Sequence, residues 1–183
     1  MKLQLSNIQK SFGAKTVLTG ANFQVRDNEK IALVGRNGCG KTTLMKIICG
    51  QENYDSGSRM LLNSTNIGYL AQITFVDEEK TVYEELLTAF DTVRELEVQL
   101  NAQAEVLKED HSEKQLARYD ALQTRFEALN GYQYEVELKN VFYHFQFDEN
   151  DLNKKLCEFS SGQKTRIALV KLLLTKPDIL LLD

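Results

Sequence analysis

Gly35, Gly40, Lys41 and Thr42 stand at the spacing Gly-x-x-x-x-Gly-Lys-Thr, and these residue types in this order suit the binding of phosphate groups. Glycines allow the backbone to curl so that successive amide groups point toward phosphate oxygens. Lys41 supplies a mobile positive charge for the β- and γ-phosphates, and the Thr42 hydroxyl is suited to ligate Mg²⁺. The pattern therefore predicts a site for a nucleoside triphosphate, with a glycine loop carrying a surface lysine as the alternative.

The segments on either side of this loop predict the elements that hold it. Residues 31–34 are an apolar run, which predicts a buried strand that enters the loop. Leu44, Ile47 and Ile48 follow at helical spacing, and the positive end of that helix would point at the same anion. Four further residues complete the predicted cradle: Asn37, Gly38, Cys39 and Thr43.

Two more segments predict parts of the same site. Residues 179–182 are apolar and predict a buried strand that ends at Asp183, where a carboxylate is the expected second ligand of Mg²⁺. Residues 3–12 and 17–25 predict two strands of an antiparallel flap. Phe12 is the aromatic residue best placed to stack on adenine, although a lone aromatic residue in a strand more often packs in the core.

A long helical pattern begins at Thr81. Leu86, Val93, Leu100 and Leu107 recur every seven residues, which predicts one long helix with a coiled-coil-like seam. A second helical pattern ends at residues 130–131, so residues 81–131 are predicted to form an antiparallel helical hairpin. This segment has more acidic than basic residues, which disfavours a broad RNA-binding face, while Lys108, Lys114 and Arg118 gather near its tip.

Residues 132–176 predict a further helical region. Ser160 has the character of a helix N-cap, and Gln163 stands at the capping-box position three residues later. Apolar residues at helical spacing then continue toward Pro177.

Composition limits the classes of protein that this chain can represent. The chain has 183 residues, 43% of them hydrophobic, and no apolar run long enough for a transmembrane helix, so no direct membrane insertion is expected. The net charge of −4 lacks the basic footprint of a nucleic-acid-binding domain. The three cysteines have neither metal-ligand spacing nor an even count, which favours a cytoplasmic setting.

Four segments in order, residues 35–43, Gln72, residues 160–163 and residues 179–183, make the chain similar to the ATP-binding cassette (ABC) ATPases over nearly its whole length. The resemblance implies ATP and Mg²⁺ as ligands. It assigns residues 35–43 to the Walker A motif, Gln72 to the catalytic Q-loop glutamine that also contacts Mg²⁺, and Asp183 to the Walker B aspartate.

The signature segment follows from the same resemblance. Phe159 and Ser161 replace the Leu and the first Gly of Leu-Ser-Gly-Gly-Gln, and both changes keep the size or character of the residue. Four residues are expected to contact ATP that is held by a second cassette: Ser160, Ser161, Gly162 and Gln163. The family's catalytic glutamate would directly follow Asp183, outside this chain, so these residues alone are expected to bind ATP without efficient hydrolysis.

The length of the predicted hairpin distinguishes between subfamilies of the ABC ATPases. The 88 positions from Gln72 to Ser160 exceed what a transporter cassette needs, and the excess resembles the arm of the ABC-F subfamily, which binds the ribosome in translation or antibiotic resistance. Two alternatives stay open: a nucleotide-binding subunit of an ABC transporter, and an ATP-dependent protein-interaction module.

The resemblance completes the expected architecture. We expect one truncated ABC domain over residues 1–183 with an α/β fold of the P-loop NTPase type. It would carry an N-terminal antiparallel β flap, the helical arm at 81–131, the signature region at 132–176, and a central sheet that is incomplete at its C-terminal side.

Overall fold

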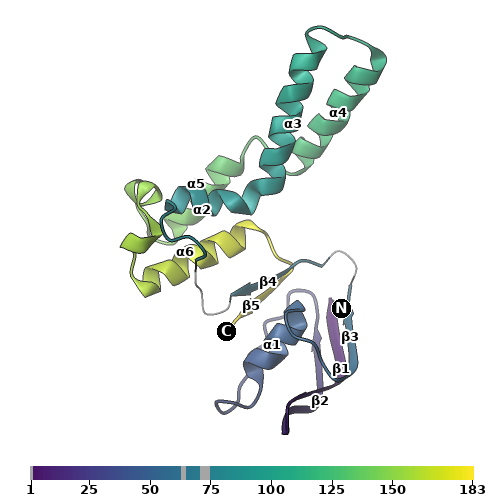
Figure 1. The fold of residues 1–183 in the computed structure, drawn as a ribbon, viewed down its shortest axis with the longest axis vertical. Coiled ribbons are helices and arrows are strands. Elements are labelled where there is room, and N and C mark those ends of the chain that lie inside the picture. Colours follow the sequence, from purple (N-terminus) through teal and green to yellow (C-terminus); the bar gives the residue numbers. More distant parts are fainter. Residues whose placement is uncertain (1, 63–64, 71–74) are drawn as a thin grey trace. The chain divides into compact units, whose positions relative to one another are not determined.

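The computed structural model describes residues 2–62, 65–70 and 75–183, and these divide into two compact units (Figure 1). The first unit comprises Met1–Gln72 and Lys176–Asp183, and the second comprises Ile73–Thr175. Each unit has its own cluster of buried apolar side chains. In the described part of the chain, no helix combines the length and the apolar character needed to cross a bilayer.

The first unit contains the predicted antiparallel flap. β1 (Leu3–Phe12) lies between β2 (Lys15–Val25) and β3 (Ser56–Leu61), and both pairings are antiparallel. The face of β1 with Leu3 and Leu5 is buried against α1 (Lys41–Cys49), which contributes Leu44, Ile47 and Ile48 to the same cluster. Alternation in the strands and helical spacing in α1 therefore predict this packing correctly.

A second, parallel sheet in this unit has two strands. β4 (Ile67–Leu70) pairs with β5 (Ile179–Leu182) in register, from Ile67 opposite Ile179 to Leu70 opposite Leu182. The expectation that β5 is a buried strand is right for two of its four side chains and wrong for the other two. Ile179 and Leu181 are buried, whereas Leu180 and Leu182 are 39% and 52% exposed, because the described residues cover only one face of this short sheet. The expected incomplete sheet is confirmed in this open form.

The predicted buried strand at residues 31–34 is also wrong. These residues have no strand structure, and Ile31 and Val34 are 42% and 92% exposed. A strand needs a neighbour for its backbone groups, and no described strand forms a ladder with this segment. A cavity that residues 30–33 and β5 both line separates the segment from the edge of β5.

The second unit is helical. Its elements are α2 (Val82–Leu87), a 3₁₀ turn (Thr88–Phe90), α3 (Asp91–Leu107), α4 (Glu113–Ala128), α5 (Tyr134–His144), two further 3₁₀ turns (Glu149–Asn153 and Leu156–Glu158) and α6 (Ser161–Leu174). The predicted single long helix from Thr81 is wrong, because the turn at Thr88–Phe90 divides it. There the Thr88 hydroxyl donates to the Glu85 carbonyl over 2.7 Å, and the buried Phe90 ring packs 5.4 Å from that of Tyr134.

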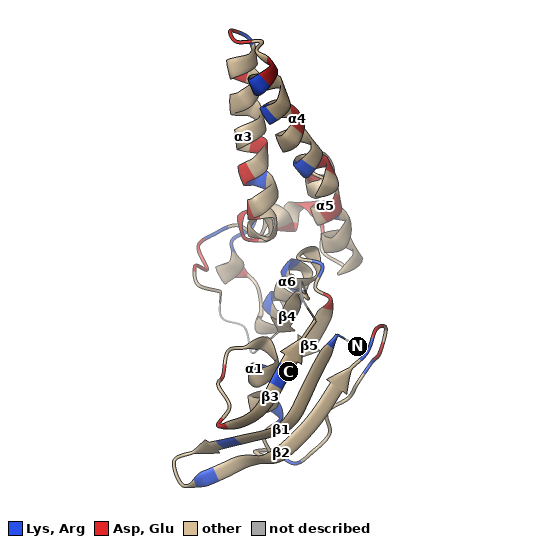
Figure 2. Cartoon of the chain, turned by 90° about the vertical axis from the view of Figure 1, so that its right-hand side faces the viewer, with Lys and Arg blue, Asp and Glu red and all other residues tan. Residues whose placement is uncertain are grey.

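The helical hairpin itself is present. α3 and α4 pack side by side, and Gln103, 4% exposed, donates from Nε2 to the Gln115 side-chain oxygen across the pair over 2.9 Å (Figure 1). Acidic and basic residues are interspersed along both helices (Figure 2), as expected for solvated faces. At the tip, Lys108 is ion-paired with Glu105 at 2.7 Å, and Lys114 is exposed.

Candidate nucleotide-binding site

The phosphate loop lies in the first unit and leads directly into α1. Gly38 and Gly40 have φ values of +79° and +95°, in the region that favours glycine. Gly40 is the N-cap of α1, and its carbonyl accepts from the Leu44 amide over 2.8 Å. The turn therefore needs glycine at these two positions, and it brings the free amides at the start of α1 to the loop.

Lys41 reaches back over its own loop. Its ammonium donates to the carbonyl oxygens of Gly35 and Arg36 over 2.9 and 3.0 Å. This places a positive charge within the curl of the loop, held by acceptors that anionic phosphate oxygens can replace. The arrangement suits a phosphate ligand better than a structural ion pair, because no acidic side chain among the described residues pairs with Lys41.

Thr42 and Asp183 meet at the end of the loop. The Thr42 hydroxyl donates to Oδ1 of Asp183 over 3.2 Å, although the two residues are 141 positions apart in the chain. Hydroxyl and carboxylate oxygens are ligands that Mg²⁺ prefers, and this ion commonly takes its other ligands from water and phosphate. The pair therefore fits the predicted magnesium site, and no described cluster of three or more acidic, histidine or cysteine residues offers a rival one.

Tyr69 is a third member of this group that the sequence did not reveal. From β4, its hydroxyl donates to Oδ2 of Asp183 over 3.1 Å. Burial and this hydrogen bond to the carboxylate raise the pKa of Tyr69 to about 12. The position three residues before Gln72 was the available signal, but only the pairing of β4 with β5 shows that Tyr69 and Asp183 meet.

A cavity of about 550 Å³ opens over these residues. Phe12, which is 48% exposed, forms part of its wall, as does Lys15, the first residue of β2. The remaining lining comes from Val17, Asn37, Gly38, Gly40, Lys41, Thr42, Thr43 and Asp183. The structure thus brings most of the predicted cradle and the predicted base platform to one cavity, with Gly35 as an acceptor for Lys41 and Cys39 exposed in the loop.

The second unit holds the signature segment. Ser160 caps α6, its hydroxyl accepting from the Gln163 amide while its own amide donates to the Gln163 side-chain oxygen over 2.9 Å. Ser161 and Gly162 are exposed, and a Cβ on Gly162 would have no atom within 4 Å. The predicted capping box is confirmed, and the exposed first turn leaves room for a ligand. Gln72 lies outside the described residues.

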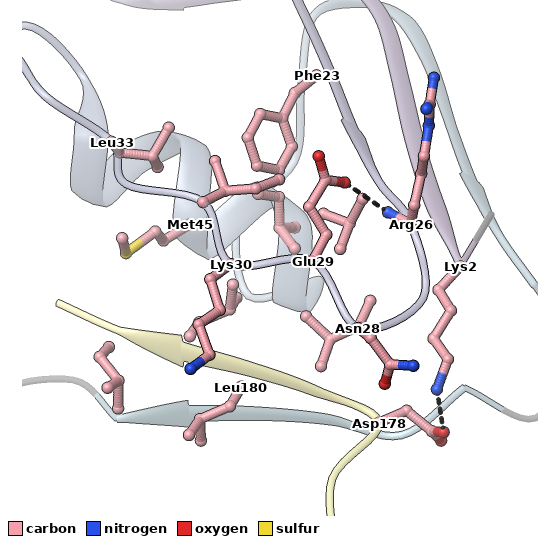
Figure 3. Close-up of a pocket in the computed structure, with 16 residues that line it drawn as sticks. Lys2, Phe23, Arg26, Asn28, Glu29, Lys30, Leu33, Met45, Asp178 and Leu180 are labelled. Carbon is pink, nitrogen blue, oxygen red and sulfur yellow. Dashed lines mark hydrogen bonds and ion pairs between the residues drawn. The ribbon is translucent and has the colours of Figure 1, made fainter.

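A second cavity in the first unit has a different character (Figure 3). It has a volume of about 520 Å³ and lies between residues 26–33 and β5. Phe23, Leu33 and Leu180 give it apolar walls. At its rim, Lys2 pairs with Asp178 at 2.7 Å. It lacks the convergent donors of the phosphate cavity and is the weaker candidate for an anionic ligand.

Comparison with known proteins adds independent findings. A family model described as ABC transporter matches residues 18–183. YdiF of Bacillus subtilis (strain 168) is 43% identical over 186 residues, covering 100% of this chain and 29% of YdiF. ABC transporter F family member 5 of Arabidopsis thaliana is 36% identical, covering 99% of this chain and 27% of that protein.

A more distant relative and a solved structure complete the comparison. The energy-dependent translational throttle protein EttA of Mycobacterium tuberculosis is 26% identical over 179 residues, covering 98% of this chain and 32% of EttA. The chain therefore spans about a third or less of these relatives' lengths. A solved ATP-binding subunit of an ABC transporter has the same fold, with a TM-score of 0.70 at 22% identity over 100% of this chain and 66% of that one.

Proposed function

The chain belongs to the ABC transporter family of ATP-binding cassettes, and from that premise we propose that it binds Mg·ATP in the cavity above α1. The observation that carries the proposal is the 3.2 Å hydrogen bond from Thr42 to Asp183, because it joins two oxygen ligands of Mg²⁺ from distant parts of the chain. Lys41 and the loop amides bind the phosphates, and Phe12 stacks on the base.

Isothermal calorimetry with Mg·ATP tests this proposal. Charge-assisted hydrogen bonds contribute about 1.5–3 kcal/mol each, so Lys41→Ala should weaken ATP binding by about tenfold or more. Lys46→Ala is the matched control, since Lys46 is an exposed lysine in the last turn of the same helix. Equal affinities for the unmodified chain and Lys41→Ala would refute the assignment.

We further propose that the complete protein hydrolyses ATP together with a second cassette, whose signature segment meets the nucleotide bound here. Residues 1–183 alone should bind ATP without efficient turnover. Asp183 is the one carboxylate among the residues that line the phosphate cavity, and it already accepts from Thr42 and Tyr69. An amide such as that of Gln72 does not act as a base near neutral pH. Turnover above about 1 s⁻¹ that Lys41→Ala abolishes would contradict this view.

For the hairpin of α3 and α4, we propose an ABC-F role, in which the arm binds the ribosome and the protein works in the cytoplasm in translation or antibiotic resistance. Similarity to two relatives, an ABC transporter F family member and a translational throttle protein, supports this proposal. So does the hairpin's extension beyond the buried cluster, since no apolar side chain past Leu100 on α3 or before Tyr119 on α4 belongs to this cluster or packs against it.

A shortened arm in the full-length protein tests this role. Replacing residues 101–117 by a short Gly-Ser turn keeps Leu100 and Leu122 in the core. We expect nucleotide binding to persist and co-sedimentation with ribosomes to fall. The double variant Lys108→Ala and Lys114→Ala asks whether the tip charges carry the contact. Unchanged ribosome association of the shortened protein would favour a transporter subunit or a protein-interaction module.

A further inference from the structure

Lys10 is a buried charge beside the proposed nucleotide site that neither the phosphate loop nor the magnesium pair uses. It is 8% exposed, although lysine is rarely buried this deeply. Lys10 and Phe12 are two residues apart on β1, so their side chains point to the same face of the strand. The Lys10 ammonium stands 4.8 Å from the centre of the Phe12 ring, within the range of a cation–π interaction.

The position of this ammonium is fixed from the other side by Glu52. The Lys10 Nζ and the Glu52 carboxylate are 2.7 Å apart, and the Glu52 amide donates to the Lys46 carbonyl in the last turn of α1. Asp55 adds two bonds to β1, since its amide donates to the Gln9 carbonyl over 2.8 Å and its carboxylate accepts from the Ser11 amide over 2.7 Å. The end of β1 is therefore braced against the segment that follows α1.

These contacts connect the two ends of the proposed ATP site. α1 begins in the phosphate loop and leads to Glu52, which holds Lys10, which in turn stands over Phe12. We propose that Lys10 is a positioning residue for the base of the nucleotide. It fixes the exposed Phe12 ring at the cavity wall and draws π-electron density toward its own side, which makes the other face a better partner for an electron-rich purine.

This inference rests on the proposed binding of ATP and adds the recognition of its base. A merely structural role for the Lys10–Glu52 pair would affect every ligand of the site equally. A positioning role would affect only ligands that carry a base. Tripolyphosphate has the phosphates of ATP without the nucleoside, so it separates the two possibilities.

The experiment measures dissociation constants of Mg·ATP and Mg·tripolyphosphate by calorimetry. Phe12→Ala should weaken ATP binding by about fivefold or more, as expected for loss of base stacking. Lys10→Met keeps the apolar stem and should weaken ATP binding by about two- to fivefold, as expected for loss of a cation–π contact. Both variants should bind tripolyphosphate as the unmodified chain does, and Lys10→Arg should restore ATP binding.

Two controls keep the test decisive. Lys2→Met breaks the Lys2–Asp178 ion pair, which is also 2.7 Å long and lies in the same unit away from the phosphate cavity, so it should leave both affinities unchanged. Adding Lys10→Met to Phe12→Ala should cause no further loss, because the ring through which Lys10 acts is gone. An equal loss for both ligands in Lys10→Met, or an additive double variant, would overturn the inference. Failure of the unmodified chain to bind ATP would instead refute the proposed function.

Discussion

Substitution of Gly40 tests how tightly the phosphate loop is packed against the flap. A Cβ at this position would lie 2.9 Å from Cγ1 of Val17, 3.0 Å from Cδ2 of Leu18 and 3.3 Å from the Val17 carbonyl oxygen. Val17 is β-branched and therefore stiff, and Leu18 is 8% exposed, so neither side chain can turn away freely. The backbone of β2 would have to shift.

The loss in the free energy of unfolding has two parts, and comparison with a substitution at Gly38 separates them. The left-handed backbone at Gly40, with φ +95°, costs a residue with a side chain about 1–2 kcal/mol. Overpacking against β2 adds about 1–3 kcal/mol, so Gly40→Ala should lower the free energy of unfolding by about 2–5 kcal/mol. Gly38→Ala should lose only the backbone part, about 1–2 kcal/mol, because φ is +79° and a Cβ there meets no atom within 4 Å.

Hydrogen exchange measured on peptides from β2 and α1 gives the opening free energy of the first unit separately from that of the helical unit. We expect Gly40→Ala to lose more protection against exchange than Gly38→Ala, and the difference should appear in the peptides of both β2 and α1. Equal losses in the two variants would show that the contacts to Val17 and Leu18 do not restrain the loop, and that only backbone conformation matters.

Three other predictions concern side-chain contacts found only in the structure. Tyr69→Phe removes the hydrogen bond to Asp183 and should raise the Mg²⁺ concentration needed for half-maximal ATP binding, whereas an unchanged magnesium titration would remove Tyr69 from the site. The pKa of Tyr69 in the folded chain is about 12, above the ordinary value of 10.0. The free energy of unfolding should therefore fall between pH 10 and 12, because the tyrosine of the unfolded chain loses its proton first, and it should fall more gently in Tyr69→Phe. Gly131→Ala places a Cβ against the buried Phe126 ring and should destabilise the helical unit by about 1–3 kcal/mol in urea unfolding. Gly162→Ala is the control and should leave the stability unchanged, because a Cβ there meets no atom within 4 Å. A larger loss in Gly162→Ala than in Gly131→Ala would contradict the packing of Phe126 on α4.

Features that depend on nearby residues were predictable from the sequence. The phosphate loop with the start of α1, the capping box of Ser160 and the antiparallel hairpin all follow from short-range patterns, and the structure confirms their local form. The ABC family, which the order of the motifs resembles, is confirmed by the family match over residues 18–183. The F subfamily, which the length of the hairpin suggests, stays a proposal that similarity to F family relatives supports. The roles of the individual site residues in ATP binding stay predictions.

Contacts between distant residues could not be predicted in the same way. Tyr69 and Asp183 are 114 positions apart, and nothing in either local pattern shows that they share a hydrogen bond. Lys10 is a charged residue in a strand, which predicts exposure, yet the ion pair with Glu52 allows its burial. The break at Thr88–Phe90 likewise depends on Tyr134, a residue of α5, rather than on the heptad pattern itself.

Residues 31–34 are an apolar segment that forms no strand, and the reason is physical. An unbroken apolar run predicts a strand that is buried on both faces of a parallel sheet, and β5 has the same character. A parallel sheet of two strands is too small to be packed on both faces by other elements, and Val34 and Leu182 are exposed. A cavity with apolar walls separates residues 30–33 from β5 (Figure 3). Hydrophobic pattern reports the environment that a segment requires, whereas a strand forms only where neighbouring backbone satisfies its hydrogen bonds. Residues 31–34 have the apolar pattern of a buried strand, but within the described chain they have no neighbouring strand to bond with, so no strand forms.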